Sequence, residues 1–144
     1  MRDINIENYD LSVKIKEEND IVIARQMVKN MVRKMGFTLS DVTKISTAVS
    51  ELARNIYRYA GEGYILLRGK QEKDGKNVGV EIVAYDRGPG IEDLDSALRD
   101  GYTTTRNSFG LGLPGVRRLM DSFSIESERG SGTIVIVSKK RRAF

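Results

Sequence analysis

The sequence predicts an α+β two-layer sandwich, in which a mixed, mainly antiparallel sheet is covered on one face by helices. Three observations predict this fold. Strand and helix patterns follow one another as β-α-α-β-β and, after a glycine-rich segment, as α-β-β. Short turns join neighbouring strands in the manner of hairpins, which favours antiparallel pairing. The helical stretches carry one apolar stripe each, so each needs a face to pack against. The 144 residues suit one domain that spans residues 1–144.

The first part of the chain predicts one strand and two helices. Residues 11–16 alternate apolar and polar side chains, as a half-buried strand does. Asp20 is the expected N-cap of the first helix, and Gly36 is its expected C-cap glycine. The second helix is expected to begin at Ser40 and Asp41. Its apolar stripe steps by three and four residues through Val42, Ile45, Val49, Leu52 and Ile56.

The second half predicts four strands and a further helix. The segment Ala60-Gly61-Glu62-Gly63 ends the second helix, and the Asp74-Gly75 dipeptide marks a hairpin turn. Residues 87–112 are rich in glycine and predict a long lid or binding loop, with a short helix near residues 93–99. Leu113-Pro114 opens the next helix, because proline suits a first helical turn. The strands are expected at residues 64–68, 78–86, 123–127 and 133–138.

The composition excludes several kinds of site. The chain has neither Cys nor His, which excludes disulfides, thiolate nucleophiles, histidine bases and the usual zinc sites. A metal would need oxygen ligands, which favours Mg²⁺ or Ca²⁺. The net charge of +4 favours an anionic ligand but is too small to indicate nucleic acid. No apolar segment approaches a membrane span or a signal peptide, so a cytoplasmic protein is expected. The basic residues 139–142 are interpreted as a solvated end.

Two polar groups stand out on patterned elements. Glu51 and Asn55 are four residues apart, so both project from one side of the second helix, where they could hold Mg²⁺ and orient a nucleophile. A polar helix edge is the alternative. Asp86 ends a strand before Gly88 and Gly90, and it could accept a hydrogen bond from an exocyclic amine while the glycines let a flat ligand approach. An ordinary Asp-initiated turn is the alternative there.

A glycine-rich turn precedes the last helix. Residues 110–115 satisfy the pattern G-x-G-x-x-G, and free N–H groups at a helix start bind phosphate. A Rossmann fold is rejected, because no strand pattern precedes the turn and too little chain follows for another βαβ unit. No phosphate-binding P-loop motif is present. The catalytic-loop signature of ordinary protein kinases is also absent.

Together these motifs resemble the GHKL (Bergerat-fold) ATPase superfamily. Its pattern is an N box with Glu and Asn, then D-x-G-x-G, then a lid ending in G-x-G, then a late Gly-x-Thr. The matches are Glu51-Leu52-Ala53-Arg54-Asn55, Asp86-Arg87-Gly88-Pro89-Gly90, Gly110-Leu111-Gly112 and Gly130-Ser131-Gly132-Thr133. Each motif is weak alone, but the four in order are specific.

Within the superfamily the chain resembles the anti-sigma-factor-type serine kinases, and in particular the small kinases paired with STAS-domain partners. Segments 47–60, 86–91, 100–104 and 110–121 carry this likeness. The sequence Leu113-Pro114-Gly115-Val116 favours the small STAS-paired kinases over the anti-sigma factors of the same group. The lid departs from the pattern. Its segment at residues 105–109 is longer and more polar than is expected for the small STAS-paired kinases.

The resemblance implies a role for each matching residue. Glu51 would be the general base or would position the substrate hydroxyl, and Arg106 would pair with γ-phosphate charge. Asn55 would coordinate Mg²⁺, and Asp86 would bind the adenine amine of ATP with help from Thr133 through a water. The other expected nucleotide contacts are Gly88, Gly90, Thr104, Gly110, Leu111 and Gly112.

The resemblance also implies a function. The chain would be a serine/threonine protein kinase that phosphorylates a STAS-domain protein in a stressosome-type partner-switching pathway and activates a PP2C-type phosphatase when released. The alternative is an anti-sigma factor with serine kinase activity that sequesters a sigma factor. A third reading is a nucleotide-gated binding module, but binding alone does not need a base such as Glu51.

Overall fold

The computed structural model describes residues 1–91, 93, 98 and 112–142. Its sheet has five strands in the order β1-β2-β3-β5-β4. Among the described residues every strand pairing is antiparallel. The expected sheet was mixed and mainly antiparallel, and the observed pairings are antiparallel throughout. The strands are β1 (Leu11–Ile15), β2 (Gly63–Gln71), β3 (Asn77–Asp86), β4 (Ser122–Glu128) and β5 (Gly132–Lys140).

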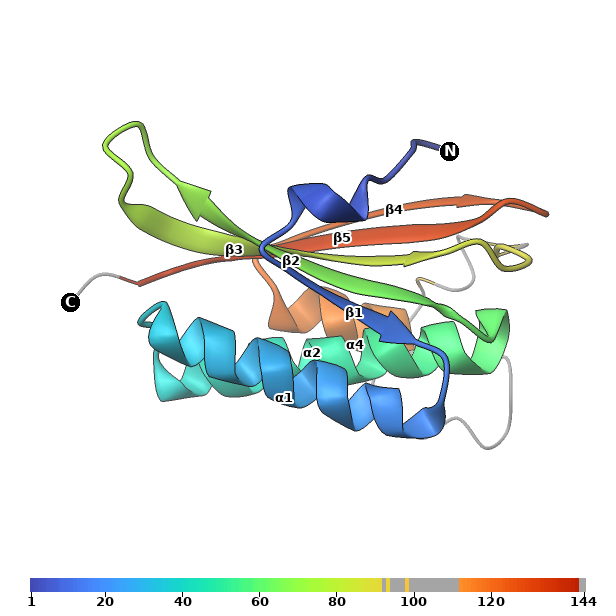
Figure 1. Cartoon of the computed structure of the whole chain (residues 1–144), viewed down its shortest axis with the longest axis horizontal. Helices are drawn as coiled ribbons and strands as arrows, with labels where there is room; N and C mark the ends of the chain where they lie inside the picture. Colours follow the sequence, from blue (N-terminus) through green and yellow to red (C-terminus); the bar gives the residue numbers. More distant parts are fainter. Residues whose placement is uncertain (92, 94–97, 99–111, 143–144) are drawn as a thin grey trace.

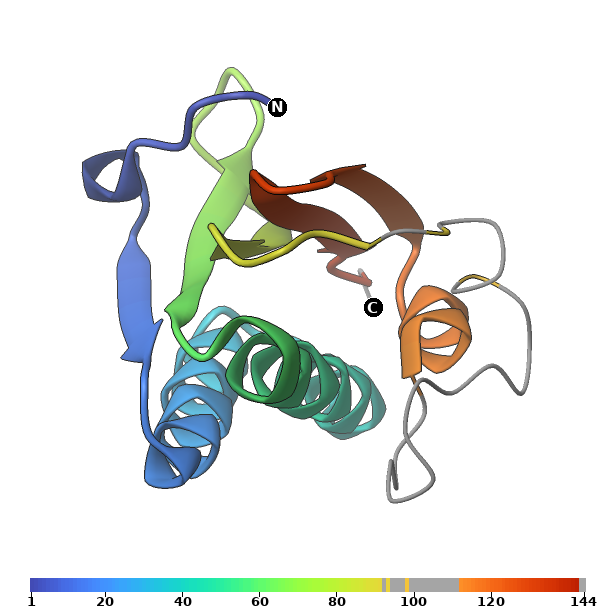
Figure 2. The same ribbon diagram turned by 90° about the vertical axis from the view of Figure 1, so that its right-hand side faces the viewer.

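In the described part of the chain, three helices form the second layer. They are α1 (Glu18–Lys34), α2 (Leu39–Asn55) and α4 (Gly112–Leu119). All three lie on the same face of the sheet (Figure 1). Seen from the side, α2 lies between α1 and α4 (Figure 2). The predicted apolar stripe of α2 is buried from Val42 to Ile56 in the core between the two layers. The predicted α+β two-layer sandwich is therefore confirmed.

The ends of the first two helices differ slightly from the predictions. The helix α1 begins at Glu18, so Asp20 lies in its first turn and is not the N-cap. The carboxylate of Asp20 instead accepts the backbone N–H groups of Lys16 and Glu17 at 2.9 and 2.8 Å. It therefore satisfies the N–H groups of the N-cap residue and of the residue before it from inside the helix. Gly36 follows the C-cap with a φ of +91°, as predicted.

The helix α2 changes its winding directly after Asn55. Residues Ile56–Ala60 form a π-helical turn, η2, in which the N–H of Gly61 donates to the carbonyl of Ile56 at 2.9 Å. Gly61 then turns the chain into β2 with a φ of +86°. Wide turns of this kind are rare and often mark functional positions, because they displace side chains relative to a regular helix.

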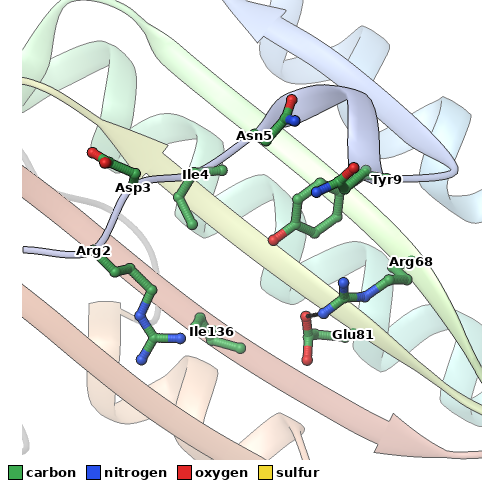
Figure 3. A pocket seen from close by; sticks show the side chains of 9 residues that line it. Arg2, Asp3, Ile4, Asn5, Tyr9, Arg68, Glu81 and Ile136 are labelled. Atoms are coloured by element: carbon green, nitrogen blue, oxygen red, sulfur yellow. Dashed lines mark hydrogen bonds and ion pairs between the residues drawn. The ribbon is translucent and has the colours of Figure 1, made fainter.

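The outer face of the sheet is partly covered by the N-terminal segment, which the sequence patterns did not indicate. Ile4, Ile6 and Tyr9 pack against a small second core that contains Leu66 and Ile134. Figure 3 shows the shallow pocket between this segment and the sheet. Arg68 lines this pocket, with its guanidinium 5.1 Å from the centre of the Tyr9 ring and 2.7 Å from the carboxylate of Glu81.

A buried lysine ties the last strand to two helices. The ammonium of Lys139 donates to the carbonyl of Leu119 at 2.9 Å and lies 3.8 Å from the carboxylate of Asp41. It also lies 3.6 Å from Asp121. Lys139 is 4% exposed and Asp41 only 1%. The interpretation of the basic end as solvated is therefore wrong for Lys139, because its charge neutralises a carboxylate at the start of α2. No helix in the described part of the chain is long and apolar enough to span a membrane.

Candidate functional site

Asp86 occupies the end of the central strand of the sheet. In the strand register Asp86 stands opposite Gly63 of β2 on one side and Thr133 of β5 on the other. Its carboxylate accepts the backbone N–H of Gly88 at 2.9 Å. The alternating pattern of β3 therefore places a half-buried carboxylate at the last residue of the strand, as the sequence predicts. This end of the strands forms one edge of the sandwich.

Burial raises the pKa of the Asp86 carboxyl above its ordinary value. The backbone N–H groups of Gly88 and Thr133 act in the opposite direction, but they do not cancel the effect of burial. The carboxylate is thus short of the stabilisation that water gives it at a surface. A ligand that donates a hydrogen bond to Asp86 would supply part of what is missing.

The glycines around Asp86 are required by packing within the protein. A Cβ on Gly88 would lie 2.6 Å from the Cβ of Ala60, and a Cβ on Gly90 would overlap the carbonyl of Glu128. A Cβ on Gly132 would overlap the carbonyl of Asp86 itself. We expected Gly88 and Gly90 to leave room for a ligand. The structure gives a nearer reason, which is that three chain segments approach one another here with no space for a side chain.

Ser127 belongs to the same edge, although the sequence analysis did not single it out. Its hydroxyl lies 2.9 Å from the hydroxyl of Thr133 and accepts the backbone N–H of Ile91 at 2.7 Å. It thereby joins β4, β5 and the chain that follows the D-x-G-x-G motif. Ser127 and Thr133 are direct partners across the two strands, so only the strand register could have revealed the pair.

Glu51 and Asn55 lie at the end of α2 that leads to this edge. Glu51 is 9% exposed, and its carboxylate forms an ion pair with the guanidinium of Arg54. Asn55 is half-buried and is the last residue of α2. The π-helical turn η2 then carries the chain to Ala60, against Gly88. The structure therefore places the N box directly before the segment that packs on the Asp86 loop.

Gly112 is the first residue of α4, and its φ is +65°. The predicted opening of this helix by Leu113-Pro114 is confirmed, and both of these residues are buried. Four expected site residues lie outside the described residues, namely Thr104, Arg106, Gly110 and Leu111.

The described residues fit a ligand that brings its own anionic oxygens. They contain no group of three or more acidic side chains that could hold a metal ion by itself. A Mg²⁺ ion commonly binds proteins through one or two oxygen ligands and takes the others from phosphates and water. The carboxamide oxygen of Asn55 could be one such ligand. The described residues thus supply a half-buried carboxylate at Asp86 and a half-buried carboxamide at Asn55.

Comparisons with known proteins identify relatives of the chain. A family model described as a histidine kinase-like ATPase domain matches residues 16–139. The serine/threonine-protein kinase RsbT of Bacillus subtilis is 49% identical over 84% of this chain and 89% of its own. The anti-sigma F factor of a Clostridium kluyveri strain is 34% identical over 91% of this chain and 95% of its own.

Solved structures show the same fold at low sequence identity. The catalytic domain of the histidine kinase ThkA has a TM-score of 0.56 at 18% identity, over 91% of this chain and 96% of its own. The RsbU and RsbW domains of a Mycobacterium tuberculosis protein give 0.59 at 20% identity, over 92% of this chain and 33% of theirs. The chain therefore belongs to the histidine kinase-like ATPase domain family and, within it, to the serine/threonine-protein kinases of the RsbT type.

Proposed function

We propose that this protein transfers the γ-phosphate of ATP to a serine or threonine hydroxyl on a STAS-domain partner in a stressosome-type pathway. Once released from that partner, it would activate a PP2C-type phosphatase. The observation that carries the proposal is the Glu51 carboxylate, which is 9% exposed and lies one helical turn before Asn55. The 49% identity to a protein named as a serine/threonine kinase supports a hydroxyl as the acceptor.

The adenine end of the proposed site is built on β3 and β5. The Asp86 carboxylate would accept the hydrogen bond of the adenine amine, and this bond is favoured because burial deprives the carboxylate of stabilisation by water. The hydroxyl of Thr133, held by Ser127 at 2.9 Å, would orient a water beside the ring. These groups bind and orient the nucleotide without taking part in bond breaking.

The reactive end of the proposed site is built on α2. Mg²⁺-ATP would supply the phosphoryl group and the charge that offsets its negative oxygens. Asn55 would contribute a carboxamide oxygen as a metal ligand. Glu51 would accept the hydrogen bond of the substrate hydroxyl and take its proton as the oxygen attacks the γ-phosphorus, while the bond from this phosphorus to the bridging oxygen breaks and ADP leaves. The proposal also retains Thr104, Arg106, Gly110, Leu111 and Gly112 as contacts to the phosphates.

The Glu51→Gln variant tests this assignment. Phosphotransfer from labelled ATP to a STAS-domain protein should fall by about 10²- to 10⁴-fold, because the carboxamide cannot take a proton. The Kd for ATP, measured by calorimetry, should stay within about threefold of the wild-type value. The interactions that bind ATP before the reaction are unchanged by this substitution. Glu72→Gln is the matched control, because Glu72 is exposed in the β2–β3 turn. Transfer at the wild-type rate in Glu51→Gln would refute the role of Glu51.

A second function is favoured by one specific observation. The anti-sigma F factor relative is 34% identical over almost the whole length of both chains. On this alternative the protein would sequester a sigma factor and phosphorylate its antagonist. Pull-down with a purified sigma factor, in parallel with the regulatory domain of a PP2C-type phosphatase, separates the two functions. Retention of the sigma factor alone would favour the alternative.

A further inference from the structure

Arg54 is in direct contact with the candidate base. Its guanidinium donates to Oε1 of Glu51, three residues earlier on α2. Residues three apart are neighbours on a helix surface, so this pairing requires no distortion of the backbone. Within the described part of the chain, Arg54 is the only residue whose side chain donates to Glu51. The second oxygen, Oε2, receives no hydrogen bond from the described residues.

The environment makes this pair more than a surface ion pair. The Glu51 side chain is 11% exposed and the Arg54 side chain is 30% exposed. A carboxylate with so little access to water requires a counter-charge. A glutamate side chain also has several rotamers, and a planar guanidinium restricts them more than an ammonium does. Arg54 thus holds one carboxylate oxygen and restricts the rotamers of the Glu51 side chain.

We infer that Arg54 is a positioning residue for phosphotransfer, which holds Oε1 of Glu51 so that Oε2 meets the substrate hydroxyl. This inference rests on the proposed function of Glu51 and extends it by assigning the residue that orients the base. Arg54 would act through Glu51 and would not touch the nucleotide. Proton transfer to a carboxylate depends on short, aligned hydrogen bonds, so a displaced Oε2 would slow the reaction without weakening ATP binding.

The test is a double-mutant cycle on purified protein with labelled ATP and a STAS-domain acceptor. Arg54→Met keeps the apolar stem and should lower kcat by about 10- to 100-fold, with the KM for ATP within about threefold of wild type. Arg54→Lys should recover part of the rate, because it restores the charge without the planar fork. In a Glu51→Gln background, Arg54→Met should cause no further loss, since the two residues act as one unit.

Arg25→Met removes an exposed arginine from α1 and should leave kcat unchanged. A full additional loss in the Glu51→Gln background, or a wild-type kcat with only a lower melting temperature, would overturn the inference. If Arg54→Met does not fold, Arg54→Gln provides the same comparison. A wild-type rate in Glu51→Gln alone would refute the proposed function instead, so the two failures are distinguishable.

Discussion

Replacing Asp86 by Asn should weaken nucleotide binding through the loss of one charged acceptor. One side of the carboxylate is engaged by the N–H of Gly88 at 2.9 Å. Asparagine can keep that bond with its carbonyl oxygen, but it then turns an NH₂ group toward the ligand. The adenine amine is also a donor, so the two groups cannot form a hydrogen bond.

The expected size follows from the kind of bond that is lost. A hydrogen bond to a charged group contributes about 1.5–3 kcal/mol, which corresponds to a Kd about 10- to 150-fold higher. The phosphate contacts are untouched by this change. The loss should therefore be the same for ATP and ADP.

The same substitution should alter the dependence of stability on pH. Because burial raises the folded-state pKa of Asp86, the folded protein binds its proton more tightly than the unfolded chain does. Stability is therefore highest while Asp86 is protonated and falls as the pH rises through the raised pKa. Asn does not titrate. The stability of Asp86→Asn relative to wild type should thus increase as the pH is raised from about 4 toward neutrality.

Two measurements check this prediction. Titration calorimetry with ATP gives the change in Kd, and urea unfolding of the nucleotide-free protein at several pH values gives the stability difference. Asp74→Asn is the control, since Asp74 is an exposed turn residue whose carboxylate accepts the N–H of Lys76. An unchanged Kd would refute the contact with adenine. A stability difference that does not vary with pH would refute the effect of burial on Asp86.

Two further substitutions test the packing. Lys139→Met should lower the free energy of unfolding by about 1–3 kcal/mol, because it removes the donor to the Leu119 carbonyl, while Arg142, 3.2 Å from Asp41, still pairs with that carboxylate; exposed Lys140→Met should have little effect in the same urea titration. Gly132→Ala should cost about 3 kcal/mol or more, since its φ is +128° and the added Cβ meets backbone. Gly130→Ala, with a φ of +81° and open space around it, should cost only about 1 kcal/mol. Equal losses in the two glycine variants would contradict the crowding at Gly132.

The order of elements could be predicted because apolar periodicity is a local property. The stripe from Val42 to Ile56 identified α2, and hairpin turns indicated the antiparallel sheet. The covering of the outer face by Ile4, Ile6 and Tyr9 could not be predicted, because a short irregular segment has no periodicity.

Lys139 is a case in which an available signal was missed. The inward positions of β5 alternate through Val135 and Val137, and continuing the same period two residues further places Lys139 on the inner face. The run of basic residues that follows suggested solvent instead. The partners of Lys139 on α2 and after α4 come from distant parts of the chain, so they required the structure.

The residues of the candidate site could likewise be predicted only in part. The position of Asp86 at a strand end was predicted. The pairing of Arg54 with Glu51 was not predicted, although their spacing of three residues on a helix allows it. The reason for the glycines could not be predicted, because it depends on chain segments that meet only in three dimensions. Ser127 was missed because its role depends on its register opposite Thr133.

The close backbone packing around Asp86 has a consequence for turnover. Gly88, Gly90 and Gly132 bring three segments together without side chains between them, so the environment of Asp86 is already formed before any ligand arrives. In the proposed site this preformed end would hold adenine, which substrate and product share. Asp86 would therefore retain ADP as firmly as ATP. Preference for ATP, and the release of ADP after each transfer, would have to be decided at the phosphate end.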